Sequence, residues 1–310
     1  MTRLLLAEFR RIAARRLVRV TVVLALVGIA GGGVLAFATS SSLSDAQYQH
    51  RVAEADAAAQ AFREQATQCM KAEGFDPDKG RVPDSVARKC FPDKGPAPAH
   101  DPRFHLTRLK GVLQGVSGVL AIVGWALGAS LVGAEFASRS MTTLLTWEPR
   151  RTRVFVAKVV AVLASSAVLA LGVLALVGLT MWPSLAFHGA AMRAADPSVA
   201  TLAGTAGRGI ALAAIAAGIG FAIAAIGRGT AAALGAGFAY IIILENILGS
   251  SIAGWRRWLL LGNVIVFVSG ENSGGDVTGR SVAGAGIFLA AVTLTLLAAA
   301  AGTFRARDLA

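Results

Sequence analysis

The chain alternates between long uncharged hydrophobic runs and shorter polar segments. A membrane-spanning helix needs about 20 apolar residues, and six runs reach or approach that length, at 20–38, 111–134, 159–187, 209–227, 229–244 and 281–304. The fifth run reaches it only by continuing past Glu245 to residue 254. A seventh run, at 258–270, is too short to cross and favours a re-entrant or interfacial segment. The pattern predicts an all-α, polytopic membrane protein with six transmembrane helices.

The polar segments divide the chain into parts with different expected surroundings. We expect an interfacial helix at 1–19, a first span at 20–40, an extracellular helical insert at 41–108, a second span at 109–134, a cytoplasmic loop at 135–153, a third span at 154–183, an extracellular loop at 184–207, further spans at 208–227 and 229–250, an extracellular or re-entrant segment at 251–280, a last span at 281–304 and a cytoplasmic tail at 305–310.

The amino-terminal segment is amphipathic and basic. Leu5, Phe9 and Ile12 share one helical face, and arginines flank them. This pattern is typical of a helix that lies in the membrane interface. A signal peptide is the alternative, because the sequence around Ala36 and Ala38 resembles a cleavage site, but the apolar run is long for that purpose.

Composition and charge support membrane insertion. The 310 residues are 55% hydrophobic and only 15% charged, which excludes an ordinary soluble domain. With both termini cytoplasmic, the inner segments hold 14 of the 30 Lys and Arg but 4 of the 18 Asp and Glu. This is the positive-inside bias. The net charge of +12 therefore reflects orientation in a cell membrane and does not indicate nucleic-acid binding.

The insert at 41–108 has a pattern of its own. Ser44 and Gln47 have the spacing of a capping box, and a heptad seam follows through Tyr48, Val52, Ala55, Ala59, Phe62, Ala66 and Cys69. The seam fits either a hairpin that packs on itself or a contact with a second subunit. Cys69 and Cys90 lie in this same segment and predict one disulfide, the alternative being two buried free thiols.

The segment at 133–158 carries an ordered set of polar residues between two spans. Glu135 directly follows an apolar run, where an unpaired carboxylate is costly, so it should find a basic partner or a helix terminus. Pro149 ends any helix before it. Arg150, Arg151 and Lys158 open the next span. An ordinary interfacial acid followed by positive-inside charge is the simpler interpretation of the same residues.

This segment resembles the permeases of ABC-2 type exporters. The resemblance rests on Gly133-Ala134-Glu135, on the stretch Thr143–Arg151 and on Lys158, and the six-span pattern extends it. The large insert departs from the simplest members. The resemblance implies that 138–147 forms a coupling helix that docks on a separate ABC ATPase subunit, with the coupling residues Glu135, Arg139, Thr143, Leu144, Leu145, Pro149, Arg150 and Arg151.

The sequence contains no phosphate-binding loop of the GxxxxGK[ST] type, so we expect no ATP site, no enzyme activity and no cofactor on this chain. ATP and Mg²⁺ would bind the partner ATPase. The four His and two Cys residues form no metal-ligand pattern, and no catalytic residue is predicted.

Glu245 is an acid inside an otherwise uncharged span, next to Asn246. Intramembrane acids face a polar cavity or a partner. The two residues are candidates for a substrate path. A structural position near the outer interface, with Arg256 or Arg257 as partner, is the alternative.

These patterns predict the permease subunit of an ABC exporter, working as a homo- or heterodimer of permeases with two ATPase subunits. A non-transporting membrane scaffold that binds partners through its insert is the alternative. Gly124 and Gly128 form a GxxxG pair that suits either a tightly packed bundle or a dimer face. The spans lack the several ionisable groups of ion-coupled transporters.

Overall fold

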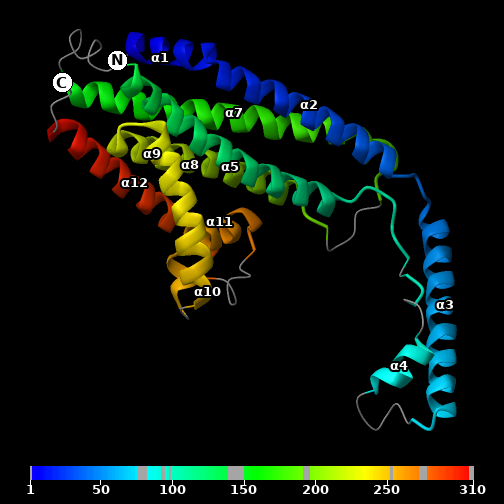
Figure 1. Ribbon diagram of the computed structural model, residues 1–310. Helices are drawn as coiled ribbons and strands as arrows, with labels where there is room; N and C mark the ends of the chain where they lie inside the picture. Colours follow the sequence, from blue (N-terminus) through cyan, green and yellow to red (C-terminus); the bar gives the residue numbers. More distant parts are fainter. Residues whose placement is uncertain are drawn as a thin grey trace. The chain divides into compact units, whose positions relative to one another are not determined.

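The computed structural model describes residues 2–75, 82–91, 95–97, 99–138, 150–190, 196–251, 254–271 and 278–306. Within these ranges the chain is helical and contains no strand, only one isolated bridge between Phe104 and Gly189. The helices are α1 (Thr2–Ala14), α2 (Arg16–Thr39), α3 (Asp45–Ala72), α4 (Asp84–Cys90), α5 (Leu106–Ala137), α7 (Arg151–His188), α8 (Val199–Gly227), α9 (Thr230–Ala239), the π-helix η2 (Tyr240–Leu248), α10 (Gly249–Ser251), the 3₁₀-helix η3 (Trp255–Trp258), α11 (Leu260–Ser269) and α12 (Val282–Ala306) (Figure 1).

Six segments are long and apolar enough to cross a membrane, which confirms the all-α, six-span prediction. They are Val18–Thr39, Leu106–Ala137, Arg151–His188, Val199–Gly227, Thr230–Ile247 and Val282–Ala306. The short seventh run forms α11, a separate helix of 10 residues. Whether α11 is re-entrant and whether α1 lies in the interface stay predictions.

Several helices extend beyond the apolar runs that predict them. α5 continues to Ala137, and α7 begins at Arg151 and ends at His188. Both ends of α7 therefore lie inside segments expected to be loops. An uncharged run marks the apolar thickness of the bilayer, whereas backbone hydrogen bonding continues into the polar interface.

The chain divides into two compact units. We call the first the bundle unit; it comprises Met1–Val34, Leu106–Met181 and Ala195–Ala310. The second, the insert unit, comprises Leu35–His105 and Trp182–Ala194. The insert predicted from the polar composition of 41–108 makes up most of the second unit.

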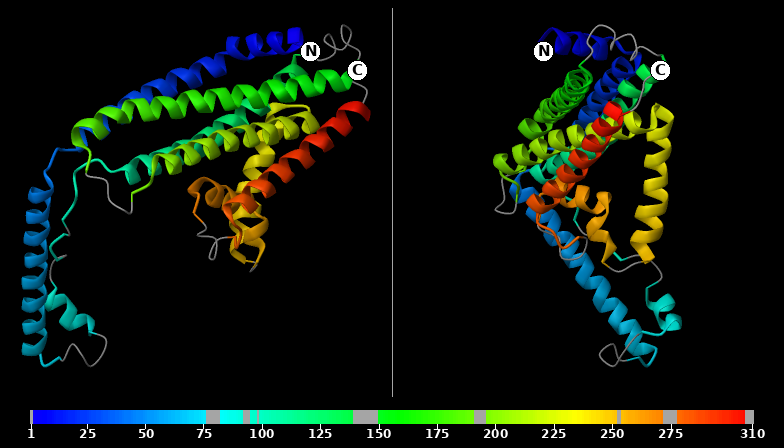
Figure 2. Two further views of the ribbon diagram at one scale, coloured as in Figure 1. Left: turned by 180° about the vertical axis from the view of Figure 1, so that it is seen from behind. Right: turned by 90° about the vertical axis from the view of Figure 1, so that its left-hand side faces the viewer.

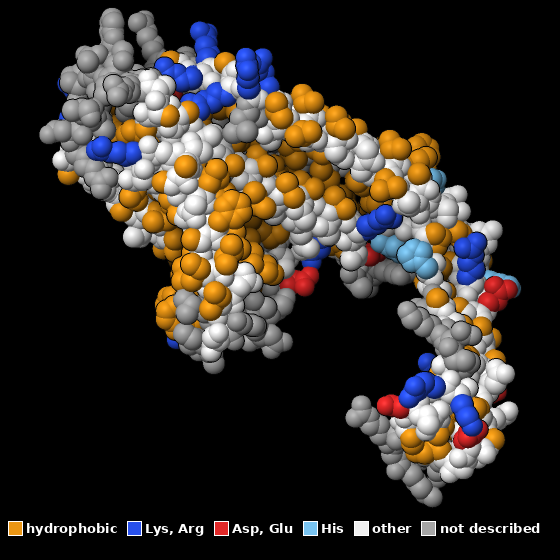
Figure 3. Space-filling view, viewed as in Figure 1, with side chains coloured by type: hydrophobic (Ala, Val, Ile, Leu, Met, Phe, Trp, Pro, Cys, Tyr) orange, Lys and Arg blue, Asp and Glu red, His pale blue; other side chains and the backbone are white. Residues whose placement is uncertain are grey.

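The bundle unit packs around a large apolar core, and a smaller cluster joins α8, α11 and α12 through Leu212, Val268 and Leu289. The large core joins α1, α5, α7, α8, α9 and α12, and includes Ile12, Phe155, Phe221 and Phe304. Hydrophobic side chains also cover much of its surface, and Lys and Arg gather at the end that carries both termini (Figures 1 and 3).

The GxxxG pair of α5 serves packing within the chain. A Cβ added at Gly128 would lie 2.0 Å from the Ala217 carbonyl oxygen, and one at Gly124 would lie 2.4 Å from that of Ala213. Both glycines therefore let α5 and α8 approach closely (Figure 2). Of the two interpretations of this pair, the structure bears out the packed bundle.

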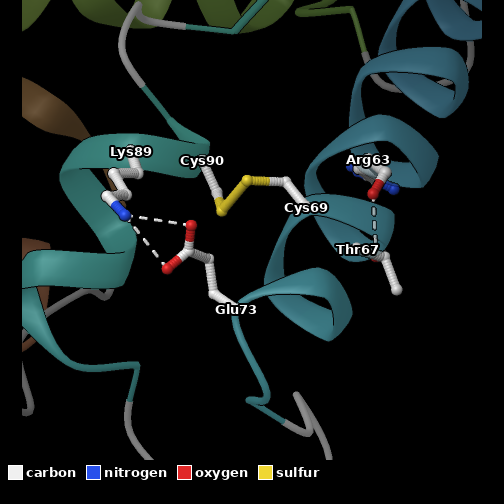
Figure 4. The surroundings of a disulfide bond; sticks show 6 residues. All are labelled: Arg63, Thr67, Cys69, Glu73, Lys89 and Cys90. Atoms are coloured by element: carbon white, nitrogen blue, oxygen red, sulfur yellow. Dashed lines mark hydrogen bonds and ion pairs between the residues drawn. A yellow bond between two sulfur atoms is a disulfide. The ribbon is translucent and has the colours of Figure 1, made fainter.

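The insert unit confirms two local predictions. The Ser44 hydroxyl accepts from the Gln47 N–H, and the Gln47 side chain accepts from the Ser44 N–H, which is the expected capping box of α3. Cys69 and Cys90 form a disulfide with their Cα atoms 5.6 Å apart, tying α4 to the end of α3 (Figure 4). Lys89 and Glu73 add an ion pair beside this bond (Figure 4).

The heptad seam of α3 is the face that this helix turns toward the rest of its unit. Phe62 packs against Phe91 with ring centroids 6.1 Å apart. Near the start of the seam, the Arg103 guanidinium lies 4.5 Å from the centre of the Tyr48 ring. These contacts favour the hairpin interpretation of the seam; a contact with a second subunit is untested.

Arg103 is the buried polar centre of the insert unit. Its guanidinium donates to both carboxylate oxygens of Asp101, at 2.9 and 2.8 Å, and pairs with Asp45. The hydrogen bonds from Arg103 hold the pKa of the Asp101 carboxyl well below its usual range.

Candidate functional site

A cluster of charged side chains joins three helices where α5 ends and α7 begins. Glu8 and Arg11 come from α1, Glu135 from the last turn of α5 and Lys158 from the second turn of α7. We call these four residues the charge cluster. Glu135 and Lys158 lie on the two sides of the segment 139–149, which is outside the described residues.

Lys158 is the centre of the charge cluster. Its ammonium donates to Glu8 Oε1 at 2.9 Å and to Glu135 Oε1 at 2.8 Å, and its Nζ lies 2.7 Å from Glu135 Oε2. One cation therefore bridges two carboxylates from different helices. Glu8 and Lys158 are 150 residues apart in the sequence.

The three central residues are buried. Glu8, Glu135 and Lys158 have exposed fractions of 7%, 5% and 5%. A charge removed from water is tolerated only when it is paired and hydrogen-bonded. The helix dipole adds a second reason for the pairing, because Glu135 occupies the carboxyl-terminal turn of α5, where a negative charge is disfavoured.

Two arginines complete the surroundings. Arg11 Nη1 donates to Glu135 Oε1 at 3.3 Å and lies 3.6 Å from Glu8 Oε1. Arg15 donates to the carbonyl oxygens of Ser130 and Leu131, at 2.9 and 3.2 Å. Burial lowers the pKa of the Arg15 guanidinium, and the Glu135 carboxylate opposes that shift. An arginine remains protonated at physiological pH in either case.

Apolar residues next to the charge cluster fix the positions of α1 and α7. Ile12, one turn after Glu8, is buried in the core of the bundle unit. Phe155, one turn before Lys158, lies 5.5 Å from the Phe221 ring and 5.6 Å from the Phe304 ring, centre to centre. The amphipathic pattern of the amino-terminal segment therefore anchors α1 on the bundle, and its acid reaches Lys158 from that position.

The predicted site residues divide into two groups. The first group lies within the described residues. Glu135 has the basic partners predicted for it, Lys158 and Arg11. Arg150 is exposed just before α7, and Arg151 donates to the Arg305 carbonyl oxygen at 3.4 Å. The other predicted coupling residues lie outside the described residues, as does nearly all of the expected coupling helix at 138–147: Arg139, Thr143, Leu144, Leu145 and Pro149.

Sequence reasoning missed Glu8 as a member of the site. The signal in the sequence was Glu8 itself, which is the single acidic residue in the strongly basic amphipathic segment at 1–19. From the sequence, Lys158 is predicted only as part of the ABC-2 motif and as one of the positive charges on the cytoplasmic side. The structure gives it two carboxylate partners.

Gly133, which begins the Gly-Ala-Glu motif, has a steric role. A Cβ added there would lie 2.2 Å from Thr230 Oγ1 and 2.3 Å from the Thr230 nitrogen. Only glycine lets α5 approach the beginning of α9 at this point.

Glu245 and Asn246 lie far along the chain from the charge cluster, in η2. The Glu245 carboxylate accepts from the Leu261 N–H at 2.7 Å, and the Asn246 amide donates to the Ile241 carbonyl oxygen at 2.8 Å. Glu245 thus has a backbone partner. A role in a substrate path remains a prediction for both residues.

The six candidate spans agree with the family that the sequence motif resembles. A family model described as ABC-2 family transporter protein matches residues 4–261. The chain belongs to this family. No curated protein and no solved structure matches it.

Membership of the ABC-2 family makes this chain a multi-pass membrane protein and the permease of an ABC transporter. An ABC ATPase partner and a lipid bilayer follow from that membership. Among the residues that the structure describes, no group of three or more His, Cys, Asp or Glu side chains could hold a metal ion. The charge cluster joins α1, α5 and α7 at one place in this ABC-2 permease.

Proposed function

We propose that this ABC-2 permease exports a substrate across the cell membrane, with both termini in the cytoplasm. It works as a dimer of permeases coupled to two ATPase subunits. ATP and Mg²⁺ bind the ATPase, and this chain has no enzyme activity and no cofactor. The coupling loop at 135–153, with its coupling helix at 138–147, carries the contact with the ATPase.

The charge cluster is the observation that carries this proposal. It connects the last turn of α5, the second turn of α7 and the amino-terminal α1, which are the elements around the proposed ATPase contact. Removing one partner of a buried ion pair costs about 3–5 kcal/mol. A displacement of the coupling loop is therefore transmitted to α1, α5 and α7 together, because separating these helices would break the buried ion pairs.

The core beside the charge cluster supports the same mechanical role. Val154, Phe155 and Ala157 are buried in the first turns of α7, so these turns cannot tilt independently of the bundle. The expected orientation is consistent with the Lys and Arg side chains gathered at the end that carries both termini (Figure 3).

The first experiment tests the ATPase contact. The tagged full chain is purified from native membranes, and the co-purifying proteins are assayed for ATP hydrolysis. Glu148→Lys, in the proposed contact, should abolish recovery of an ATPase, whereas Lys89→Met, in the insert unit, should not affect it. Recovery of equal ATPase activity with Glu148→Lys would contradict the contact, and recovery of none with the wild-type chain would contradict the function.

A second experiment separates docking from transmission. Lys158→Met should keep the ATPase bound but lower transport per ATP hydrolysed, since the coupling loop is unchanged whereas the ion pairs that join α1, α5 and α7 are lost. Export is tested with inverted vesicles: ATP is added outside, and the uptake of each compound from a panel of lipids and apolar drugs is measured. Accumulation only in right-side-out vesicles would contradict the proposed direction.

The alternative of a non-transporting scaffold gains no support from the described residues or from the family match.

A further inference from the structure

Two arginines and three aromatic rings meet where η3 lies beside the beginning of α12. The Arg280 guanidinium lies 4.3 Å from the centre of the Phe288 ring and 4.9 Å from that of Trp258. The Arg257 guanidinium lies 5.5 Å from the same Trp258 ring, and the Trp258 and Phe288 rings are 6.2 Å apart. We call these four residues, together with Trp255 of η3, the arginine–tryptophan cluster.

The arginine–tryptophan cluster faces the surroundings of the protein. Trp255 and Trp258 are 46% and 56% exposed, and Arg257 is exposed as well. Residues three apart in a 3₁₀-helix lie on the same side, so the two indole rings share one face of η3. In a membrane protein, exposed tryptophans beside a span are typical of the level of the lipid headgroups.

The two arginines of the cluster have no acidic partner among the residues that the structure describes. The described acids in this part of the bundle unit are engaged elsewhere: Glu245 accepts from the Leu261 N–H, and Glu271 pairs with Lys110. A guanidinium that lies over an aromatic ring keeps its N–H donors in its own plane, where they can bind the oxygens of an anion. The cluster therefore suits a negatively charged ligand.

Membrane topology does not account for these two positive charges. Helix α12 runs from the cluster to the carboxyl terminus, so Arg257 and Arg280 lie at the end of the bundle unit opposite to both termini (Figure 1). The positive-inside bias favours Lys and Arg at the end that carries the termini. A bound anion gives the arginines at the opposite end a physical reason.

Exposed apolar side chains continue from the cluster along two helices. Ile287 and Leu294 of α12 are seven residues apart, which places them on one face, and both are more than half exposed. Leu261 and Ile265 of α11 are four residues apart and also more than half exposed. Since α11 packs on α12, both strips begin near the cluster (Figure 2). A phosphate at the cluster with acyl chains along these strips is the arrangement of a phospholipid.

We propose that the arginine–tryptophan cluster is a binding site for an anionic phospholipid in the leaflet opposite to the termini. Arg257 and Arg280 bind the phosphate oxygens, and Trp255 and Trp258 lie beside the headgroup. The acyl chains cover the apolar strips of α11 and α12. This site requires only that the chain spans a membrane, so it is independent of the direction of transport and of the ATPase contact.

The test measures lipid binding to the full chain, purified in a neutral detergent, by native mass spectrometry. The probes are phosphatidylglycerol and phosphatidylcholine with identical acyl chains. We expect more bound phosphatidylglycerol, because the choline group would bring a third positive charge to two arginines that have no described acidic partner. Equal binding of the two lipids would overturn the proposed preference for an anionic headgroup and with it the site.

Ser281 offers a pair of variants that keeps the fold. Its hydroxyl accepts from the Gly284 N–H at 3.1 Å, as an N-cap does, and aspartate and asparagine are equally good N-caps. Ser281→Asp places a negative charge next to Arg280 and should weaken phosphatidylglycerol binding about fivefold, the effect of one charge near a membrane surface. Ser281→Asn is the neutral control and should bind as the wild type does.

Removal of the two cations should have a larger effect. Arg257→Gln combined with Arg280→Gln should weaken phosphatidylglycerol binding about 25-fold, because two charges are lost. The matched control is Arg51→Gln combined with Arg63→Gln, which removes the same charge from two exposed positions of α3 and should leave binding unchanged.

Two results would overturn the proposal at the level of the variants and of the ligand. Equal binding by Ser281→Asp and Ser281→Asn, or by the two double variants, would leave the cluster to another occupant, such as a protein partner. An excess of glycerol 3-phosphate should not displace the lipid, because it lacks acyl chains. Displacement would assign the arginines to a soluble phosphate compound instead of a phospholipid.

Discussion

Replacing Lys158 by methionine should destabilise the bundle unit strongly. The substitution keeps the length of the side chain but leaves the Glu8 and Glu135 carboxylates buried without their shared cation. At an effective dielectric constant near 20, two unit charges 4 Å apart attract by about 4 kcal/mol. Arg11 stays within 3.3 Å of Glu135, so part of the attraction survives. We expect a loss of about 3 kcal/mol, at the lower end of the range for broken buried pairs.

Thermal unfolding of the purified full chain in detergent measures this loss. A change of 1 kcal/mol shifts the Tm of a medium-sized protein by roughly 2–4 °C, so the variant should unfold at least about 5 °C below the wild type. Lys89→Met is the matched control, because it breaks an ion pair with Glu73 whose side chains are 66% and 38% exposed. An exposed pair contributes about 0–1 kcal/mol.

The physical reason can be tested separately from the size of the effect. Adding Glu8→Gln and Glu135→Gln to Lys158→Met removes all three buried charges and should recover most of the lost stability. A Tm for Lys158→Met equal to that of Lys89→Met would refute the reasoning. A triple variant less stable than Lys158→Met would refute the part that assigns the loss to unpaired carboxylates.

Three further predictions concern packing, the disulfide and pH. Gly128→Ala should lower Tm by several degrees, because the new Cβ would meet the Ala217 carbonyl oxygen at 2.0 Å. Cys69→Ala should make the insert unit cleavable by added protease, since a disulfide closing a loop of about this length contributes about 3 kcal/mol. The pKa of Asp101 is lowered in the folded protein, so its contribution to stability is complete above about pH 4 and is lost as pH falls through the lowered pKa. Protease resistance of the insert unit should decrease below pH 4, and Asp101→Asn should be less resistant at pH 7 and less sensitive to acid.

Each of these predictions has a matched comparison. Gly115→Ala adds a methyl group to the same helix where nothing lies within 4 Å, and its Tm should equal the wild-type value. Reducing the wild-type disulfide should reproduce the cleavage of Cys69→Ala. A steep acid transition that persists in Asp101→Asn would show that another carboxyl group controls it.

The sequence by itself determined the class, the number of spans and the local devices of this protein. The length of an apolar run predicts a span because it must match the thickness of the bilayer, and the Ser44 capping box predicts the start of a helix. Both patterns are formed by residues that are close together along the chain. Because an unpaired charge at the end of an apolar span costs free energy, the sequence also predicted a basic partner for Glu135.

Only the tertiary structure decided which distant groups meet. Glu8 and Lys158 are separated by 150 residues, and nothing in their local sequence says that their helices touch. Glu245, which accepts from the Leu261 N–H, lies in a π-helix, and i→i+5 hydrogen bonding has no clear mark in the apolar sequence of that span. Spacing along one chain fixes the face of a helix, whereas the partner of that face is chosen by packing among helices.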